Sequence, residues 1–330
     1  MPIRVSAILS TLASLFVAAM VEAKDFRSAN IGERDSPTVQ GVAYVDKLIR
    51  ERTGDRHQIK SLGQNERDSE SFTLAEIRNG TLDMARLTLA PFSQSVPATM
   101  VLSLPFVFKS TAQMRRVIDG PIGDEILAGM EELGIVGLCF YDLGARSFYS
   151  TEKPIRKIAD MSGMKVRVLQ TDAWVTFMKA LGVSALSIPH DRVYGALKSQ
   201  LIDAAGNNWS TYVASRHYEV AKFYNLTEHS MSPGVVVFSK KIWDGLTKED
   251  QAIIRAAAKE SVALVRELTD EREISARKAA VSAGTQVITD IDKKSFSDVL
   301  TPLYGLVLPD PRLLDMVARI QAIDLSQTPR

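Results

Sequence analysis

The feature that most constrains the fold is a helical pattern that runs without interruption from about Lys248 to Ser282. Its apolar residues recur on one face, and the residues 247–250 (TKED) form a capping box before its first turn. At ~1.5 Å per residue such a helix is roughly 50 Å long, which exceeds the width of one small domain. We therefore expect this helix to run across two lobes.

The rest of the chain alternates between short apolar segments and helical patterns. The run Ile135–Tyr141 is apolar throughout, as expected of a strand that is buried on both faces. Pro105 lies within the apolar segment Leu102–Phe108, which we therefore interpret as a buried crossing segment and not as a central strand. Further strands are predicted at 59–62, 84–89, 165–168 and 235–238, and helices at about 37–52, 70–79, 123–133 and 191–198. The alternation predicts an α/β fold.

Composition narrows the classes of function. The chain has 330 residues, of which 45% are hydrophobic and 24% charged, as in ordinary globular proteins. Lys and Arg number 40 against 39 Asp and Glu, so the net charge is +1. Nucleic-acid binding and docking on an anionic membrane both need a clear basic excess, so near-neutrality argues against both partners.

The residues that usually hold metals or perform catalysis are sparse. The only cysteine is Cys139, within the apolar run, so an intramolecular disulfide and a Cys-rich zinc site are excluded and an inert core thiol is expected. The four histidines have no close metal-ligand spacing, and His229 is expected after a helix end. Sequence motifs for dinucleotide, P-loop, HExxH and GxSxG sites are absent. We expect no cofactor, no metal and no catalytic residue.

The N-terminus predicts export. Arg4 precedes the uncharged apolar stretch 5–21, and residues 21–23 (VEA) resemble an Ala-x-Ala cleavage site. We expect a signal peptide over 1–23, cleaved after Ala23, and a periplasmic mature chain without membrane insertion. The alternative is a single membrane anchor, although the stretch is shorter than the ~20 residues that spanning requires.

Three arginines lie on otherwise apolar segments. Arg86 and Arg167 lie on predicted strands, and Arg146 follows a buried one. A charged residue on a buried strand must be paired, or it costs several kcal/mol. One explanation is a structural salt bridge for each arginine. The other is an anionic ligand, because a guanidinium group binds a carboxylate through two parallel hydrogen bonds.

Polar groups near these arginines favour the ligand explanation. Gly144 would let the backbone approach a ligand closely. Asn207 and Asn208 are expected in a short loop after Gly206, where their amides could bind hydroxyl groups, and Trp209 could form an apolar wall.

Several segments in this order resemble the solute-binding proteins of TRAP (tripartite ATP-independent periplasmic) transporters, the DctP family. The likeness extends from about Asp25 to Ile320. Each segment alone is weakly specific, whereas their order and spacing together are specific. They are 76–84 (EIRNGTLDM), 104–106 (LPF), 144–146 (GAR), 158–168 (IADMSGMKVRV), 193–197 (VYGAL), 201–209 (LIDAAGNNW) and 218–222 (YEVAK).

The resemblance implies a two-lobed α/β periplasmic binding protein with a ligand cleft between its lobes. Lobe I would comprise 24–143 plus about 232–270, and lobe II 144–231 plus about 271–330. The chain would capture a small carboxylate, most plausibly a sugar acid such as a hexuronate or aldarate. It would deliver this ligand to the small and large membrane subunits of a TRAP permease.

The resemblance also implies roles for single residues. Arg167 matches the family's main carboxylate clamp, Arg146 a second ligand arginine, and Asn207 the residue that reads the other end of the ligand. Glu70 matches a residue of the first lobe that faces the cleft. Residues similar to those of the sugar-acid subgroup are Arg86, Asn207, Asn208, Trp209 and His229.

Two positions depart from the family pattern. Arg192 and Gly206 stand where the family commonly has Glu. Both changes make the neighbourhood more positive, so a ligand with a second carboxylate becomes possible if these positions reach the cleft. If they do not reach it, the ligand class is unchanged.

Two other functions remain open from the sequence. An exported enzyme acting on a sugar acid would need a general base, for which Glu70, His190 and His229 are the candidates. A ligand sensor that docks on a receptor kinase would share every feature of the transport protein.

Overall fold

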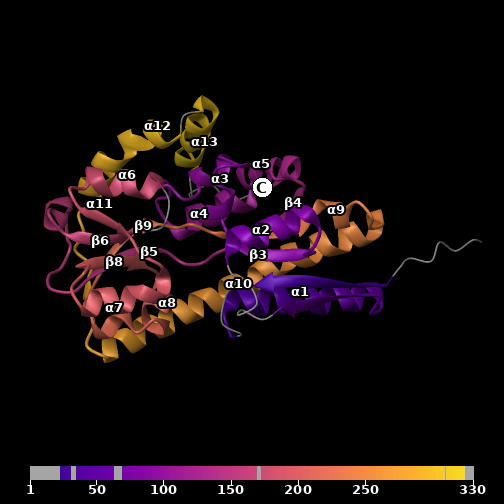
Figure 1. The fold of residues 1–330 in the computed structure, drawn as a ribbon, viewed down its shortest axis with the longest axis horizontal. Helices are drawn as coiled ribbons and strands as arrows, with labels where there is room; N and C mark the ends of the chain where they lie inside the picture. Colours follow the sequence, from indigo (N-terminus) through magenta and orange to yellow (C-terminus); the bar gives the residue numbers. More distant parts are fainter. Residues whose placement is uncertain (1–22, 31–34, 63–68, 169–171, 309, 324–330) are drawn as a thin grey trace, which may run out of the picture.

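The computed structural model describes residues 23–30, 35–62, 69–168, 172–308 and 310–323. The predicted signal peptide, 1–23, lies outside this part except for Ala23. Figure 1 shows two α/β units that lie next to each other along the longest axis of the molecule. We call the unit with the five-stranded sheet lobe I and the unit with the six-stranded sheet lobe II.

The sheet of lobe I has the order β2-β1-β3-β10-β4. β1 is parallel to both of its neighbours, whereas β10 is antiparallel to β3 and β4. Every residue of β4 is buried, as the apolar run predicted. The strands are β1 (Lys24–Asn30), β2 (His57–Leu62), β3 (Met84–Thr88), β4 (Ile135–Tyr141) and β10 (Gly234–Ser239).

The helices of lobe I follow from local sequence signals. The Ser36 side chain accepts a hydrogen bond at the start of α1, with Pro37 in the first turn, and Gly54 ends this helix at a φ of +59°. Ser69 and Ser110 cap α2 and α4 in the same way. The helices are α1 (Pro37–Thr53), α2 (Glu70–Asn79), α3 (Ala98–Val101), α4 (Thr111–Asp119), α5 (Pro121–Gly129) and α9 (Lys240–Trp243).

The sheet of lobe II has the order β11-β9-β5-β8-β6-β7. Only β6 was predicted, because the other strands are short or interrupted by polar residues. The strands are β5 (Arg146–Ser150), β6 (Lys165–Val168), β7 (Ser184–Ser187), β8 (Ala204–Asn207), β9 (Phe223–Ser230) and β11 (Gln286–Ile288). The helices are α6 (Asp172–Ala180), α7 (Val193–Lys198), α8 (Trp209–Ala214) and α11 (Lys293–Leu300).

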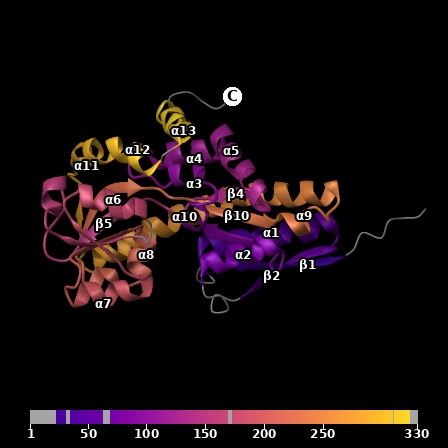
Figure 2. The same ribbon diagram turned by 45° about the horizontal axis from the view of Figure 1, so that its top comes forward.

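The long helix α10 (Lys248–Ser282) joins the two lobes, as predicted. It packs on α1 and β4 of lobe I and on α8 of lobe II, and both views of the ribbon show it running from one lobe to the other (Figures 1 and 2). In lobe I, the Tyr141 hydroxyl lies 2.7 Å from the Ser261 hydroxyl. In lobe II, the Glu273 carboxylate accepts hydrogen bonds from the backbone amides of Trp209 and Ser210. Within the described residues, no helix combines the length and apolar character needed to cross a bilayer.

The C-terminal helices return from lobe II to lobe I. After α11, the chain continues through α12 (Tyr304–Val307) to α13 (Pro311–Gln321), which packs on α3. The Gln113 amide of α4 donates to the carbonyl oxygen of Ile320 at 3.0 Å. The predicted lobe boundaries assign 271–330 to lobe II, but the contacts of α13 are with helices of lobe I.

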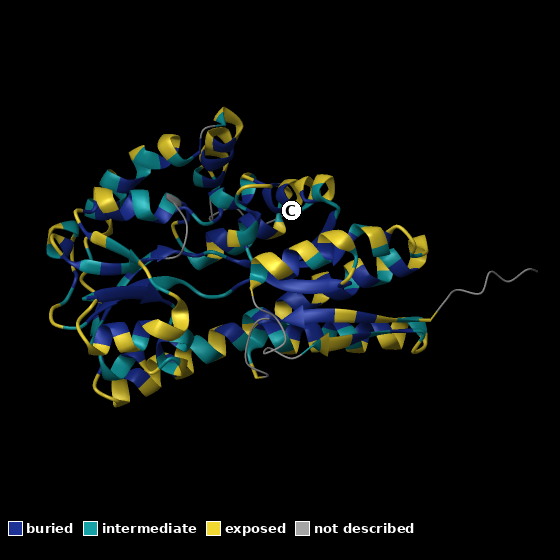
Figure 3. Ribbon diagram, viewed as in Figure 1, coloured by how far each residue is buried: buried dark blue, intermediate teal, exposed yellow. Residues whose placement is uncertain are grey.

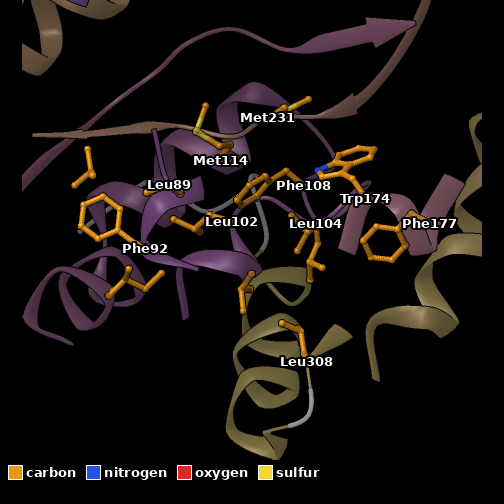
Figure 4. Packing of buried hydrophobic residues seen from close by; sticks show 14 of the residues in the cluster. Leu89, Phe92, Leu102, Leu104, Phe108, Met114, Trp174, Phe177, Met231 and Leu308 are labelled. Carbon is orange, nitrogen blue, oxygen red and sulfur yellow. The ribbon is translucent and has the colours of Figure 1, made fainter. Parts of the chain in front are cut away.

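One apolar cluster contains residues of both lobes. The crossing segment Leu102–Phe108 forms no strand and is largely buried, in agreement with the interpretation of Pro105. Figure 4 shows Leu104 and Phe108 beside Trp174 of α6, with Leu308 of the C-terminal segment nearby. Exposed residues lie mainly on the outer faces of the helices, and the strands are mostly buried (Figure 3). The two lobes therefore share one hydrophobic core where they meet.

An ion pair at the start of α10 yields a prediction about stability. The buried Asp250 carboxylate accepts hydrogen bonds from the Arg56 guanidinium at 2.7 and 2.9 Å, which lower its pKa from 3.8 to about 2. We expect Asp250→Asn to lower the free energy of unfolding by about 1.5–3 kcal/mol near neutral pH. Because the folded-state pKa lies below the unfolded value, this contribution is present above about pH 4 and is lost as the pH falls through about 2.

Chemical denaturation of the wild type and of Asp250→Asn between about pH 7 and about pH 3 measures this difference. The matched control is Glu260→Gln at the exposed Arg52–Glu260 pair, which should cost less than about 1 kcal/mol. A difference between wild type and Asp250→Asn that stays constant over this pH range would contradict the prediction.

Candidate ligand-binding site

The candidate site is built around two arginines of lobe II. Arg146 opens β5, where its guanidinium donates to the Asn207 Oδ1 at 2.7 Å and to the Gly206 carbonyl oxygen. Arg167 lies on β6 and donates through Nε to the Ile188 carbonyl oxygen at 2.9 Å. Within the described residues neither guanidinium has a carboxylate partner, so the salt-bridge explanation does not apply to them.

The electrostatics of this pair favour an anionic ligand. Burial, and then the positive charge of Arg167, lower the pKa of Arg146 to about 10. Burial also lowers the pKa of Arg167. Both arginines line one small pocket, so a carboxylate placed there would relieve their repulsion and replace lost hydration. The other residues of this pocket are Phe148, Val168, Trp174, Met178, Gly206 and His229.

His229 lies on strand β9 and not after a helix end, so that expectation was wrong. Its ring stacks on Phe148, with the centroids 3.9 Å apart at 15°, and meets the edge of Trp174 at 5.7 Å. Burial, and then the charge of Arg146, hold the pKa of His229 well below its usual 6.5. The imidazole is therefore neutral and supplies no further positive charge.

Asn207 belongs to the arginine site, with a role that the sequence did not show. Its amide oxygen accepts from Arg146 and from the backbone amide of Asn208, and its carbonyl oxygen accepts from the Tyr224 hydroxyl. These bonds fix the amide at the end of β8. Asn207 thereby orients the Arg146 guanidinium.

Asn208 and Trp209 lie behind the site. The Asn208 side chain caps α8 by accepting from the Thr211 amide, and it donates to the Leu143 carbonyl oxygen. The Trp209 ring is buried against Tyr224, with the centroids 3.5 Å apart. In the described structure both side chains support the strand ends and do not line the pocket.

Lobe I contributes a second group of polar residues at the carboxyl ends of its parallel strands. Arg86 of β3 is 5% exposed, its Nε has no partner in the described structure, and burial lowers its pKa. Asn30 pairs in register with Arg86, and both polar atoms of its side chain are buried without a described partner. Glu70 of α2 lies near Arg86, but its carboxylate is held by the backbone amide and hydroxyl of Thr88.

The sequence analysis missed Asn30, Phe148, Trp174 and Met178. A polar residue at the end of a parallel strand could have identified Asn30, because ligands bind at the carboxyl ends of such strands. Conversely, the structure leaves Arg192 exposed before α7, and Arg192 does not line the pocket. Arg192 is therefore not brought to the two arginines.

The site contains no metal centre in the part of the chain that is described. No group of three or more His, Cys, Asp or Glu side chains is arranged there to hold an ion. Cys139 is buried in β4, and burial raises the pKa of its thiol, which is consistent with an inert core residue. A larger cleft of about 400 Å³ lies between α5, β4 and α10, where Arg266 is already paired with Asp119.

The fold and the arginine site together define a class: a two-lobed binding protein for a small anion. The chain belongs to the family described as bacterial extracellular solute-binding protein, family 7 (DctP), which it matches over residues 28–307. A solute-binding protein of Chromohalobacter salexigens is 32% identical over 97% of this chain and 95% of its own length. The 2,3-diketo-L-gulonate-binding periplasmic protein of Escherichia coli is 30% identical over 81% of both chains.

Solved structures agree with this assignment. A TRAP periplasmic solute-binding protein of Bradyrhizobium sp. BTAi1, in complex with α/β-D-galacturonate, is 48% identical, with a TM-score of 0.84 over 91% of this chain and 100% of its own. A second, from Chromohalobacter salexigens with bound D-glucuronate, is 33% identical, with a TM-score of 0.85 over 90% of this chain and 99% of its own. The two-lobed α/β architecture predicted from the sequence is thus confirmed.

Arg167 has no carboxylate partner among the described residues, and this observation yields a second prediction. We expect Arg167→Met to leave the free energy of unfolding of the ligand-free protein unchanged or to raise it by up to ~1 kcal/mol, because a desolvated cation without a carboxylate partner is removed. Thermal unfolding without ligand measures this effect. As a control, Arg56→Met breaks a structural ion pair and should lower the unfolding temperature. A comparable loss for both variants would show that Arg167 has a structural role.

Proposed function

We propose that this protein captures a hexuronate through Arg146 and Arg167 and delivers it to a TRAP-type membrane permease. The observation that carries the proposal is the adjacency of two partly buried guanidinium groups without a carboxylate partner in the described chain. Two cations held together in this way match one carboxylate, whose negative charge would be shared between them.

The comparisons support a sugar acid as the ligand. Relatives that are 48% and 33% identical were solved with galacturonate and glucuronate. The carboxylate would bind at Arg167 and Arg146 in lobe II. Arg86 and Asn30 of lobe I would then meet hydroxyl groups at the other end, because Asn30 ends β1, Arg86 lies beside it on β3, and both carry buried polar atoms without a described partner.

Closure of the lobes would supply the binding energy. A ligand held between the lobes is removed from water, which strengthens its ion pair with the arginines. Preferential binding to the closed form then shifts the population toward that form. The permease would recognise the closed shape, as in other members of this transporter class.

We also propose that the protein is exported to the periplasm. The proposed cleavage after Ala23 would start the mature chain at Lys24, which is the first residue of β1. The first strand would therefore be intact after cleavage. Related proteins of Escherichia coli and Rhodobacter capsulatus are described as periplasmic.

We infer that the protein performs no chemistry on its ligand. Of the candidate general bases, Glu70 is held by Thr88 and His229 has a pKa far below neutrality. His190 lies outside the pocket, with its Nε2 3.0 Å from the Ser215 hydroxyl. A catalytic base needs a pKa near the working pH and a place beside the substrate, and none of the three combines both.

The direct test is calorimetry and thermal unfolding of the mature protein, residues 24–330, after denaturing purification and refolding to remove carried ligand. Galacturonate and glucuronate at ~1,000 times their Kd should add about 4 kcal/mol of stability and raise Tm by several degrees. Galactose is the matched neutral control and galactarate the matched diacid. The proposal fails if galactose raises Tm as much as galacturonate, or if no uronate raises it.

Arg167→Ala tests the clamp itself. We expect it to weaken galacturonate binding by about 2–5 kcal/mol, the range for removing one partner of a buried ion pair. Arg192→Ala is the control, because this exposed arginine does not line the pocket and should leave the affinity unchanged. Titration calorimetry measures both, and an unchanged affinity for Arg167→Ala would exclude the clamp.

A further inference from the structure

Strand β9 is distorted where it passes the arginine site. β9 pairs with β5 at Asn225↔Phe148 and again at Ser230↔Arg146, so that several residues of β9 lie opposite the single residue Ser147. Within this bulge, Glu228 has a φ of +43°, in the left-handed region that non-glycine residues rarely adopt. Bulges of this kind redirect side chains, and they are frequent beside functional sites.

Two buried hydroxyl groups replace the ladder hydrogen bonds that the bulge removes. The backbone amide of Glu228 donates to the Ser147 hydroxyl at 3.1 Å. The backbone amide of Phe148 donates to the Thr227 hydroxyl, also at 3.1 Å. Ser147 is 1% exposed and Thr227 is fully buried. The bulge is therefore held by specific contacts on both strands.

The Thr227 hydroxyl also contacts His229. Its oxygen lies 2.9 Å from the His229 Nδ1, so it has two partners in the described structure. The Phe148 amide can only donate, which leaves Nδ1 as the one acceptor for the hydroxyl proton. A buried hydroxyl proton without an acceptor is costly, so the satisfied arrangement has Thr227 donating to Nδ1. The imidazole proton then lies on Nε2.

The environment of the ring directs that Nε2 into the pocket of the arginines. A Cβ at Gly206 would lie 3.1 Å from the His229 Cε1 and 3.2 Å from its Nε2, so this edge of the ring occupies the space that a side chain at 206 would fill. The ring of His229 stacks on Phe148 and makes an edge-to-face contact with Trp174. Glycine at 206, one of the two departures from the family pattern, thus leaves room for the imidazole edge.

We propose that Thr227 is a positioning residue that fixes His229 as its Nε2–H tautomer, so that His229 donates a hydrogen bond to an acceptor oxygen of the ligand next to the carboxylate held by Arg146 and Arg167. The contact to the ligand rests on the proposed function, whereas the tautomer does not. In a uronate the acceptor would be the ring oxygen or a hydroxyl oxygen adjoining the carboxylate. The ring stays neutral because burial and Arg146 hold its pKa well below 6.5.

In this arrangement Arg146, Arg167 and His229 surround the carboxylate of the ligand, and each of them donates hydrogen bonds. Two of them are charged and bind the anion, and the third is neutral and adds direction without adding charge. The site would consequently favour acids that carry an oxygen acceptor on the adjoining carbon over acids that carry only methylene groups there. This preference distinguishes a sugar acid from a simple alkyl carboxylate.

The tautomer is measured first, by long-range ¹H–¹⁵N correlation spectra of the mature protein without ligand. The His229 signals are assigned by their loss in His229→Gln. We expect a protonated Nε2 and a bare Nδ1 in the wild type and in Thr227→Ser, which keeps the hydroxyl. Thr227→Val keeps the shape but removes the hydroxyl, and its His229 should populate both tautomers. A protonated Nδ1 in the wild type would overturn the proposal.

Affinity for galacturonate is measured on the same three proteins by calorimetry. Thr227→Val should weaken binding about tenfold, while Thr227→Ser should retain most of the affinity. Gly206→Ala provides an independent variant, since its methyl group would push the ring edge away and weaken binding several-fold with the tautomer unchanged. Wild-type affinity in Thr227→Val, despite a mixed tautomer, would overturn the ligand contact.

The two proposals fail in different ways. If the wild type carries the Nε2–H tautomer but binds neither galacturonate nor glucuronate, then the proposed function and the ligand contact are overturned, and the role of Thr227 in fixing His229 stands. If the wild type binds galacturonate but carries the proton on Nδ1, then the proposed function stands and this inference is overturned.

Discussion

The interaction on which the candidate site depends is the repulsion between two guanidinium groups that are partly withdrawn from water. Arg146 and Arg167 each retain hydrogen bonds to backbone carbonyl oxygens, which hold them in place without neutralising their charge. Such an arrangement costs folding free energy, and a structural ion pair would have removed that cost. The fold tolerates it because the surrounding strands and the shared apolar cluster are already well packed. In the proposed function, the cost is recovered when an anion enters.

The residues around the arginines come from two lobes, and the two groups differ in how firmly they are fixed relative to the arginines. Within lobe II, strand ends and the β9 bulge fix the positions of Asn207, Phe148 and His229 through backbone and hydroxyl contacts. Lobe I holds Arg86 and Asn30 on a separate sheet, so their distance from the clamp depends on how the lobes are oriented. The His229 carbonyl oxygen accepts from the backbone amide of Phe106, which has a φ of +60° in the crossing segment. His229 of lobe II is therefore bonded directly to the crossing segment of lobe I.

Much of this architecture could be predicted from local sequence signals. Ser36, Pro37 and Gly54 define α1, the apolar run of β4 defines a buried strand, and the periodicity of α10 defines a helix that joins two lobes. The arginines were recognisable because charge on an apolar strand is unusual. These signals are strong because each depends on residues that are adjacent in the sequence.

The rest depends on contacts between distant residues. The strand β9 contains Asn, Thr, Glu and His, and its bulge is stabilised by Ser147 about 80 positions earlier, so periodicity could not identify it. Asn208 and Trp209 have the composition of ligand-binding residues, yet one caps a helix and the other packs on Tyr224. Asn30 becomes conspicuous only when β1 is paired with β3. The return of α13 to lobe I has no local signal at all, because it follows from the packing of its apolar face on α3 and α4.

The shared core between the lobes has a consequence for how this protein can change over evolution. Leu104 of the crossing segment, Trp174 of α6 and Leu308 of the C-terminal segment belong to one apolar cluster, and α10 adds a rigid connection beneath it. The lobes are therefore not independent modules, and recombination that joined a lobe from one relative to a lobe from another would have to rebuild this cluster. New specificities in such a chain arise more readily by point substitutions beside the arginine site, at positions such as Gly206, than by exchange of whole lobes.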